Sequence, residues 1–228
     1  MINLLDIKTP TQAQSAALKS DYGLDNHGLF NLGGVYWNLP TEALYEEIVF
    51  RKEGTITRDG PVVMNTGKHT ARSANDKFVV REPSTEEQIW WGQYNRPFAP
   101  DKFDELFARV QGFLQGRDVF VQDCYVGADP DYRMPVRIIT EHAWHSLFAR
   151  NMFLPPRTNE EYRRHVPDFT VLCCPNFKGI QQIDGTGSNT FIVLNFAERL
   201  CIIGNTAYAG EIKKSIFTVM NYLMPLQG

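Results

Sequence analysis

The second half of the chain alternates strand-length apolar segments with helical segments, and this alternation restricts the fold more than any other feature. Several of the apolar segments are nearly continuous in apolar residues, which is typical of strands covered on both faces of a sheet. The segments expected as strands are 118–126, 136–140, 169–174, 190–196 and 200–203, and helices are expected at 140–152 and 210–223. Intermixed strands and helices predict an α/β domain with a mixed β-sheet and flanking helices.

Pro100 opens the clearest amphipathic helix, which Gly116 is expected to end. Its apolar residues follow a 3.6-residue period, as expected when one face packs against a core: Phe103, Leu106, Phe107, Val110, Phe113 and Leu114. Shorter strand-like pieces are expected at 35–37, 61–64 and 78–80, and the first twenty residues are polar with a weak helical pattern.

Several local patterns predict where other helices and turns begin. Thr41 is expected to cap a helix that runs to about Arg51. Ser84 and Thr158 each precede a glutamate by three residues, the spacing of a capping box. The pair Asp184-Gly185 predicts a tight turn before the strand at 190.

The charge balance and the cysteines limit the partners and the compartment. The 228 residues, enough for one domain, include 23 Lys and Arg against 26 Asp and Glu, a net charge of −3, so a nucleic-acid or anionic-membrane surface is not expected. The cysteines at 124, 173, 174 and 201 contain no Cys-x-x-Cys pair and are too few for a disulfide framework. With no signal-peptide pattern at the start and no membrane-length apolar run, we expect a cytoplasmic protein.

The polar segment 66–73 is the first candidate binding loop. Its Gly67-Lys68 pair lacks the upstream glycine and the Ser or Thr of a phosphate loop. Arg72 remains a candidate, because a guanidinium fork suits a carboxylate or a phosphate and the segment lies between two expected strands. The alternative is a solvated loop.

The second candidate is the segment 204–214, where a buried strand leads into a helix. Lys213 and Lys214 stand near the start of that helix, where its dipole disfavours cations. Free N–H groups, the dipole and the two ammonium groups would together form an anion site. The alternative, left open at this point, is a solvent-facing lysine pair screened by Glu211.

Three other groups of residues favour packing over chemistry. His142 and His145 match no zinc-protease pattern, so packed or capped histidines are expected. The pair Cys173-Cys174 lies in an expected buried strand. Trp90, Trp91 and Tyr94 could stack on bases, but core or interface packing is the better interpretation because basic residues are not in surplus nearby.

From about residue 23 to 228 the chain resembles ATP-dependent phosphoenolpyruvate carboxykinase, in the order and spacing of that family's motifs. The matching stretches are 31–39, 66–81, 121–129, 133–144, 150–153, 194–199 and 208–223. The resemblance implies the fold of that family's N-terminal domain, with 23–228 as the substrate-side domain and 1–22 as a weakly helical extension. It also implies a gluconeogenic lyase that converts oxaloacetate and ATP into phosphoenolpyruvate, CO2 and ADP with Mg2+ and Mn2+.

The resemblance also implies roles for four residues. Arg72 corresponds to the arginine that holds the carboxylate of oxaloacetate or phosphoenolpyruvate near CO2, and Tyr208 to a tyrosine beside them. Lys213 resembles the lysine that faces the transferred phosphoryl group, and Lys214 resembles a lysine ligand of Mn2+ that also touches the substrate. An enolate intermediate requires such oxyanion stabilisation.

The family's phosphate loop and its remaining metal ligands have no counterpart in this chain. The resemblance therefore implies a domain that is inactive alone, that binds no cofactor tightly, and whose partner is the C-terminal nucleotide-binding domain. The alternative is a stand-alone dicarboxylate- or phosphate-binding or regulatory module. The family usually has Gly, Pro and Lys where this chain has Ala71, Ala74 and Asn75, and Gly at Asn205. A glycine replaced beside Arg72 is expected to shift the loop.

Overall fold

A computed structural model describes residues 18–227 of the chain. The weak helix expected near the N-terminus falls mostly on residues 1–17, which lie outside this range. Ser20 is buried and its hydroxyl donates to the carbonyl of His165, so the first described residues already contact the body of the fold. Within the described residues, no helix is both long and apolar enough to cross a membrane.

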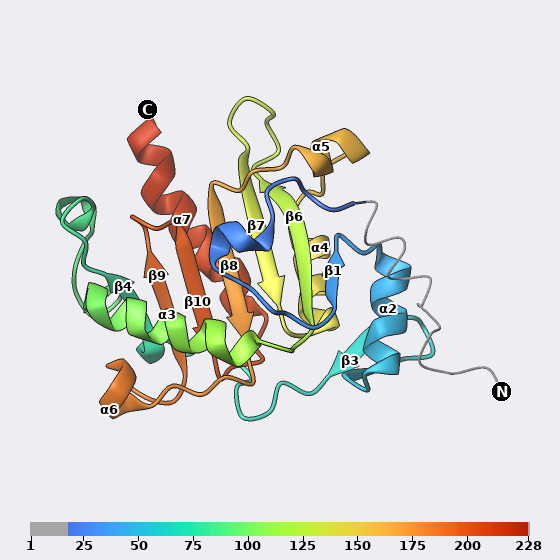
Figure 1. Cartoon of the computed structure of the whole chain (residues 1–228), viewed down its shortest axis with the longest axis horizontal. Helices are drawn as coiled ribbons and strands as arrows, with labels where there is room; N and C mark the ends of the chain where they lie inside the picture. The colour runs from blue at the N-terminus through green and yellow to red at the C-terminus, as the bar shows by residue number, and fades with distance from the viewer. Residues whose placement is uncertain (1–17, 228) are drawn as a thin grey trace.

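An eight-stranded mixed sheet forms the centre of the molecule, in the order β1-β6-β7-β8-β10-β9-β4-β5 (Figure 1). The neighbours β7, β8 and β10 are parallel, whereas the β6–β7 and β9–β10 pairs are antiparallel. A separate antiparallel pair, β2–β3, lies outside this sheet. The strands are β1 (Val35–Trp37), β2 (Gly54–Ile56), β3 (Val62–Met64), β4 (Lys77–Val80), β5 (Arg96–Phe98), β6 (Val119–Val126), β7 (Met134–Thr140), β8 (Phe169–Cys174), β9 (Phe191–Asn195) and β10 (Leu200–Gly204).

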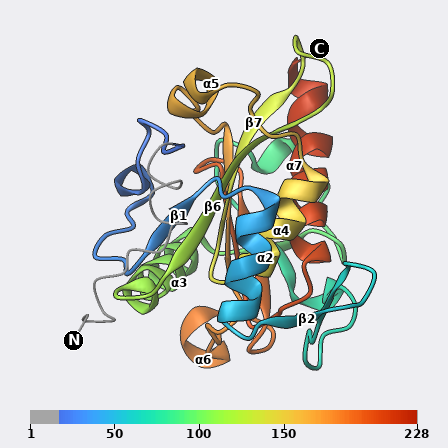
Figure 2. The ribbon, with the colours of Figure 1, turned by 90° about the vertical axis from the view of Figure 1, so that its right-hand side faces the viewer.

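Helices cover both faces of the sheet, as the edge-on view in Figure 2 shows. One face packs against α3 and the other against α4 and α7. Successive side chains of β8 point to opposite faces of the sheet and pack into two cores. Leu172 and Cys174 lie on the α3 side, and Val171 and Cys173 lie on the α7 side. The helices are η1 (Leu24–His27), α2 (Thr41–Phe50), η2 (Ala74–Asp76), η3 (Glu86–Gln88), α3 (Pro100–Leu114), α4 (Ala143–Met152), α5 (Asn159–Arg163), α6 (Gln181–Asp184) and α7 (Gly210–Gln227).

The predicted α/β class with a mixed sheet is confirmed, and the expected strands and helices of the second half lie within a few residues of their predicted bounds. Helix α3 begins at Pro100 and buries the predicted apolar face. Two local predictions were wrong in detail. Thr41 is the first helical residue of α2, whose N-cap is Pro40. The turn at Gly185 is the left-handed C-cap of the short helix α6.

The two predicted capping boxes differ in the structure. The Thr158 hydroxyl accepts from the backbone N–H of Glu161 at 3.1 Å and caps α5. The pattern at Ser84 was wrong, because the chain forms only the short helix η3 there and no side chain caps it. A capping hydroxyl acts on the unpaired N–H groups in the first turn of a helix, and residues 84–88 form only a single short 3-10 turn.

We therefore expect Thr158→Ala to lower the free energy of unfolding by about 1 kcal/mol, the usual contribution of an N-cap hydroxyl. Ser84→Ala is the matched control, and its effect should stay within about 0.5 kcal/mol, as for other exposed positions. Urea denaturation of both variants measures the difference. Equal effects at the two positions would contradict this assignment of the cap.

Candidate active site

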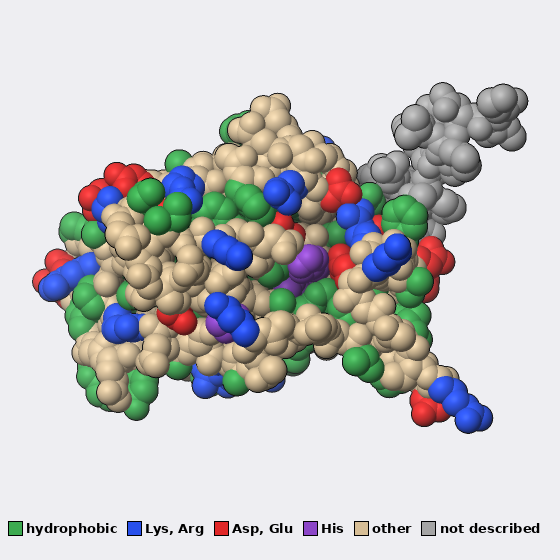
Figure 3. Space-filling model, turned by 90° about the horizontal axis from the view of Figure 1, so that it is seen from below, with side chains coloured by type: hydrophobic (Ala, Val, Ile, Leu, Met, Phe, Trp, Pro, Cys, Tyr) green, Lys and Arg blue, Asp and Glu red, His purple; other side chains and the backbone are tan. Residues whose placement is uncertain are grey.

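The strands β7, β8 and β10 end at the same edge of the sheet, and the candidate residues gather there. In open α/β sheets, ligands bind beyond the carboxyl ends of the strands. Figure 3 views the molecule from this edge and shows separate Lys and Arg side chains across the middle of the face. After β10 the chain passes through Asn205, which has a left-handed φ of 55°, and begins α7 at Gly210.

The loop that carries Arg72 reaches the same edge from another part of the chain. It connects β3 to β4, and β4 lies beyond β9 in the sheet. The backbone N–H of Ser73 donates to the Glu211 carboxylate at 2.6 Å, which joins the loop to the first turn of α7. The His69 ring lies between the Ser73 hydroxyl and the Thr190 hydroxyl, at 3.0 and 3.1 Å.

A pocket of about 410 Å³ lies between this loop and the start of α7. The four residues predicted from the sequence all line it, although they come from two separate segments of the chain. Its lining comprises Thr66, Arg72, Trp144, Phe148, Met152, Tyr208, Ala209, Gly210, Lys213 and Lys214.

The charges of this pocket favour an anion. Three cationic side chains line it and no acidic side chain does, in a chain whose net charge is −3. Glu211 is only 6% exposed, and its carboxylate accepts from the Ser73 N–H and forms no ion pair with either lysine among the described residues. Lys213 is exposed, so the solvent-facing lysine pair remains an alternative. Convergent cations beside a helix start attract carboxylates and phosphates.

The expected contribution of free N–H groups at the helix start is corrected in part. The N–H groups of Glu211 and Ile212 donate to the carbonyls of Tyr208 and Ala209, at 3.1 Å each. These two donors are therefore occupied within the turn. The side chains of Arg72, Lys213 and Lys214 carry the formal positive charges that line the pocket.

An apolar wall faces the cations and was not identified from the sequence as part of the site. Trp144, Phe148 and Met152 recur along α4 at spacings of four residues, so they project from one side of that helix into the pocket. Their helical spacing was the available signal, but it is also the pattern of a core face. Such a wall lowers the local dielectric constant and strengthens the attraction between an anion and the cations.

The ring of Tyr208 lies tightly against the start of α7. A β-carbon built on Gly210 would come within 2.4 Å of the Tyr208 ring, so a larger residue at position 210 would displace that ring. Glycine is therefore required here by the close approach of the tyrosine to the backbone. Tyr208 lines the pocket together with Lys213 and Lys214.

A smaller cavity of about 260 Å³ adjoins the pocket and shares Arg72 and Lys214 with it. Lys77 and Glu211 also line this cavity; Glu211 is buried and Lys77 is half-buried. Burial lowers the pKa of Lys77, and the nearby Arg72 lowers it further. Burial raises the pKa of Glu211, partly offset by its hydrogen bond from Ser73. Neither residue was identified as part of the site from the sequence.

The positions that depart from the family pattern behave differently from one another. Ala71 does not have a positive φ, so its side chain imposes no strain of the kind that a replaced glycine suggested. Asn205 does have one, at 55°, and asparagine tolerates that region better than most residues. Its side-chain amide donates to the Thr190 hydroxyl at 3.0 Å.

The other candidates from the sequence do not line the pocket. His145 is fully buried and its ring contacts the carbonyl of Ala207 at 2.9 Å, which confirms the packed interpretation. The four cysteines are buried free thiols. Trp90 and Tyr94 are 87% and 70% exposed, so the core half of the predicted core or interface packing was wrong, and interface packing stays a prediction.

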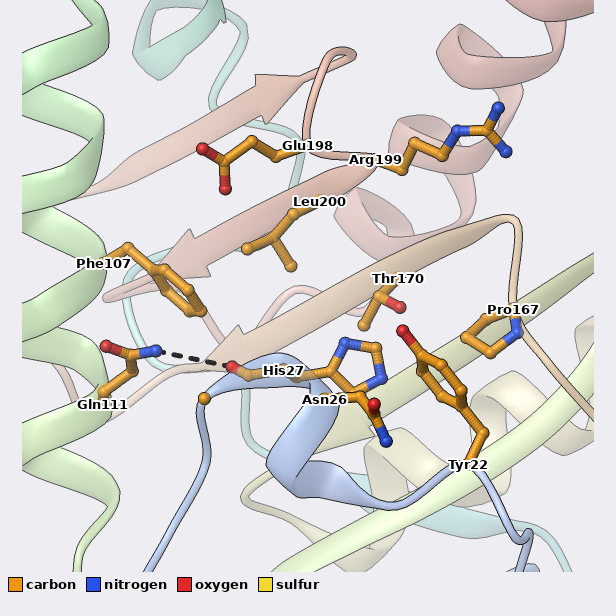
Figure 4. Close-up of a pocket in the computed structure, with 11 residues that line it drawn as sticks. Tyr22, Asn26, His27, Phe107, Gln111, Pro167, Thr170, Glu198, Arg199 and Leu200 are labelled. Atoms are coloured by element: carbon orange, nitrogen blue, oxygen red, sulfur yellow. Dashed lines mark hydrogen bonds between the residues drawn. The ribbon is translucent and has the colours of Figure 1, made fainter.

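A second pocket, of about 350 Å³, lies on the α3 face and is lined by none of the four predicted site residues. Figure 4 shows the His27 ring between Phe107 and Tyr22, with Leu200 and Thr170 nearby. Arg137 donates to His27 Nε2 at 3.2 Å, and burial together with that cation lowers the pKa of His27 to about 4. The histidine is therefore neutral near pH 7.

The described residues do not form a complete metal site. Lys214 offers one nitrogen, and its Nζ lies 5.0 Å from the centre of the Phe217 ring. Within residues 18–227, no group of three His, Cys, Asp or Glu side chains could hold a metal ion. One lysine nitrogen by itself does not satisfy the coordination that Mn2+ requires.

Comparisons with known proteins agree with the resemblance. A family model described as phosphoenolpyruvate carboxykinase matches residues 33–228. The chain is 55% identical over 203 residues to a protein of Geotalea uraniireducens (strain Rf4) named "Phosphoenolpyruvate carboxykinase (ATP)". The matched region is 89% of this chain and 38% of that relative. Similarly named proteins of Moorella thermoacetica and Thermus thermophilus are 50% and 51% identical, over 92% and 85% of the chain. The chain spans about 40% or less of the length of these relatives.

Proposed function

Because the chain belongs to the family of ATP-dependent phosphoenolpyruvate carboxykinases, which are carboxy-lyases, we propose that it supplies the substrate-binding side of such an enzyme. The reaction converts oxaloacetate and ATP into phosphoenolpyruvate, CO2 and ADP, in the cytoplasm and in the direction of gluconeogenesis. Residues 23–228 form the substrate-side domain and residues 1–22 an extension. The observation that carries the proposal is that one pocket is lined by Arg72, Tyr208, Lys213 and Lys214.

Each of these side chains suits one part of the reaction. The planar fork of Arg72 binds the substrate carboxylate, and the Tyr208 phenol donates a hydrogen bond beside it. Loss of CO2 from oxaloacetate leaves an enolate, whose negative charge the neighbouring cations stabilise. Lys213 faces the phosphoryl group as it moves to the enolate oxygen, and Lys214 contacts the substrate and, when Mn2+ is bound, the metal.

The nucleotide and the complete metal site lie outside this proposal for the chain alone. The family uses ATP and divalent metal ions, but the sequence contains no phosphate-loop motif. We therefore propose that the isolated chain binds the substrate and does not turn it over, and that a nucleotide-binding domain is its partner. Turnover of oxaloacetate by the 228-residue chain alone would contradict this division of labour.

We expect Arg72→Ala to weaken the binding of phosphoenolpyruvate by about 10- to 100-fold, the range for one charge-assisted hydrogen-bonding group. Isothermal titration calorimetry of the wild-type chain and the variant measures the difference. Lys68→Ala is the matched control, because Lys68 is an exposed cation of the same loop that does not line the pocket. Equal affinity in wild type and Arg72→Ala would contradict the assignment of Arg72.

The same pocket also suits a second function, anion binding without catalysis. Its three cations and apolar wall are formed by this chain alone, without a nucleotide. Inorganic phosphate and small dicarboxylates separate the two functions. A substrate-side domain should prefer phosphoenolpyruvate or oxaloacetate to these simpler anions, whereas a regulatory anion module should bind them comparably.

A further inference from the structure

The loop that carries Arg72 has no regular structure of its own between β3 and the short helix η2, yet it must hold a guanidinium at the pocket. Arg72 itself is exposed, and no hydrogen bond from its side chain is formed with the described residues. Its position therefore depends on the contacts of its neighbours. An exposed loop without such contacts would sample many conformations, and each ligand-binding event would have to order it.

The first contact comes from Glu211 in α7. Its carboxylate accepts from the backbone N–H of Ser73 at 2.6 Å, and Ser73 is the residue directly after Arg72. Glu211 is buried in the first turn of α7, so its hydrogen bond holds the backbone of the loop next to the arginine. A hydrogen bond to a buried carboxylate is among the stronger ones in proteins.

The second contact is a chain of side chains that ends at Asn205. The Asn205 amide donates to the Thr190 hydroxyl at 3.0 Å, which contacts His69 Nε2 at 3.1 Å. The other nitrogen of the ring lies 3.0 Å from the Ser73 hydroxyl. Asn205 stands at the end of β10, just before the Tyr208 loop, so this chain joins the two sides of the pocket.

We propose that Glu211 and Asn205 are positioning residues, which together hold the loop 66–76 against β9, β10 and α7 so that Arg72 stays at the pocket. This inference rests on the proposed function for its consequence in ligand binding. Asn205 stands where the resembling family usually has glycine, and in this chain its side chain adds a hydrogen bond that glycine cannot make.

Limited proteolysis of the 228-residue chain tests the hold on the loop without any ligand. Trypsin cleaves after Lys68 and Arg72, both exposed, and mass spectrometry follows each cut. Cleavage follows the open population of the loop, so losing the bond to Glu211 in Glu211→Ala should speed cleavage about tenfold or more. Asn205→Gly should speed it by about two- to fivefold, because glycine adopts the same φ without strain and removes only the side chain.

Two further variants separate positioning from general destabilisation. Glu211→Gln keeps an oxygen that accepts from Ser73 but loses the carboxylate charge, so cleavage and phosphoenolpyruvate affinity should lie between those of Glu211→Ala and wild type. Glu141→Ala is the matched control, because Glu141 is also buried at this edge of the sheet. Its carboxylate accepts from the backbone N–H of Asn176 at 3.0 Å, and Asn176 belongs to a different loop. It should leave cleavage at Lys68 and Arg72 near the wild-type rate.

The proposal is overturned if Glu211→Ala is cut no faster than Glu141→Ala, or if Glu211→Gln is cut as fast as Glu211→Ala. Calorimetry with phosphoenolpyruvate supplies the second readout, in which Glu211→Ala should bind about tenfold more weakly. Faster cleavage with unchanged affinity would overturn the positioning role. If phosphoenolpyruvate binds neither wild type nor variants while the cleavage rates differ as expected, the proposed function fails and the hold on the loop stands.

Discussion

Replacing Asp123 by alanine is expected to lower the free energy of unfolding by about 3–5 kcal/mol, because it leaves the Arg137 guanidinium buried without its counter-ion. Arg137 Nε donates to Asp123 Oδ1 at 2.7 Å, and both side chains are 0% exposed. Asn38 makes two hydrogen bonds with Asp123. The side-chain amide of Asn38 donates to Asp123 Oδ2 at 3.2 Å, and its side-chain oxygen accepts from the backbone N–H of Asp123 at 2.6 Å. Urea denaturation at pH 7 measures the loss.

A double variant separates the orphaned charge from lost packing. Adding Arg137→Met to Asp123→Ala removes the unpaired guanidinium, so the double variant should be more stable than Asp123→Ala alone. Asp168→Ala is the control, because Asp168 forms an exposed ion pair with Arg199 at 3.4 Å. This substitution should change the free energy of unfolding by no more than about 0.5 kcal/mol. A double variant that loses the sum of the two single effects would contradict the ion-pair argument.

Lowering the pH below about 6.5 is expected to reduce the free energy of unfolding. The buried histidines stay neutral in the folded chain, but they gain a proton when the chain unfolds. Burial lowers the pKa of His145 to about 3, with a smaller lowering from His142 and an opposing effect from the Ala207 carbonyl. The unfolded chain binds a proton near pH 6.5 and the folded chain only near pH 3, so the contribution is present above pH 6.5 and is lost below it. At pH 5 the loss is about 2 kcal/mol for this residue.

His27 should add a similar loss of about 2 kcal/mol at pH 5, because its pKa is lowered to about 4 by burial and by Arg137. Burial also lowers the pKa of His165. The raised pKa values of Glu141 and Glu211 act in the opposite direction, since the folded chain then binds protons more readily than the unfolded one. Stability at a single pH therefore does not isolate the histidines.

The difference between wild type and His145→Gln isolates one histidine, because the contributions of the glutamates cancel. Urea denaturation at pH 7 and pH 5 should show that wild type loses about 2 kcal/mol more than the variant on acidification. Glutamine retains a donor for the Ala207 carbonyl, so the variant remains measurable. His27→Gln should reduce the pH dependence in the same way. Parallel pH dependences in wild type and His145→Gln would contradict the low pKa.

Local patterns predicted most of the secondary structure because they report on burial, and burial in this fold follows sequence periodicity. The apolar face of α3 was read correctly because residues three and four apart share a helix face. The failures occurred where a side chain's partner is distant in sequence. Trp90 and Tyr94 carry apolar surface, but no element of the described chain covers them. The role of Glu211 also depends on a partner more than a hundred residues away, Ser73.

The sequence by itself determined the α/β class, the family and the identity of four candidate side chains, because these depend on residue order and local spacing. Only the tertiary structure decided that Arg72 meets Tyr208, Lys213 and Lys214 in one pocket. The physical reason is the strand order β8-β10-β9-β4, which brings the β3–β4 loop to the start of α7. Backbone pairing between distant strands sets that order, and no periodicity within a single segment records it.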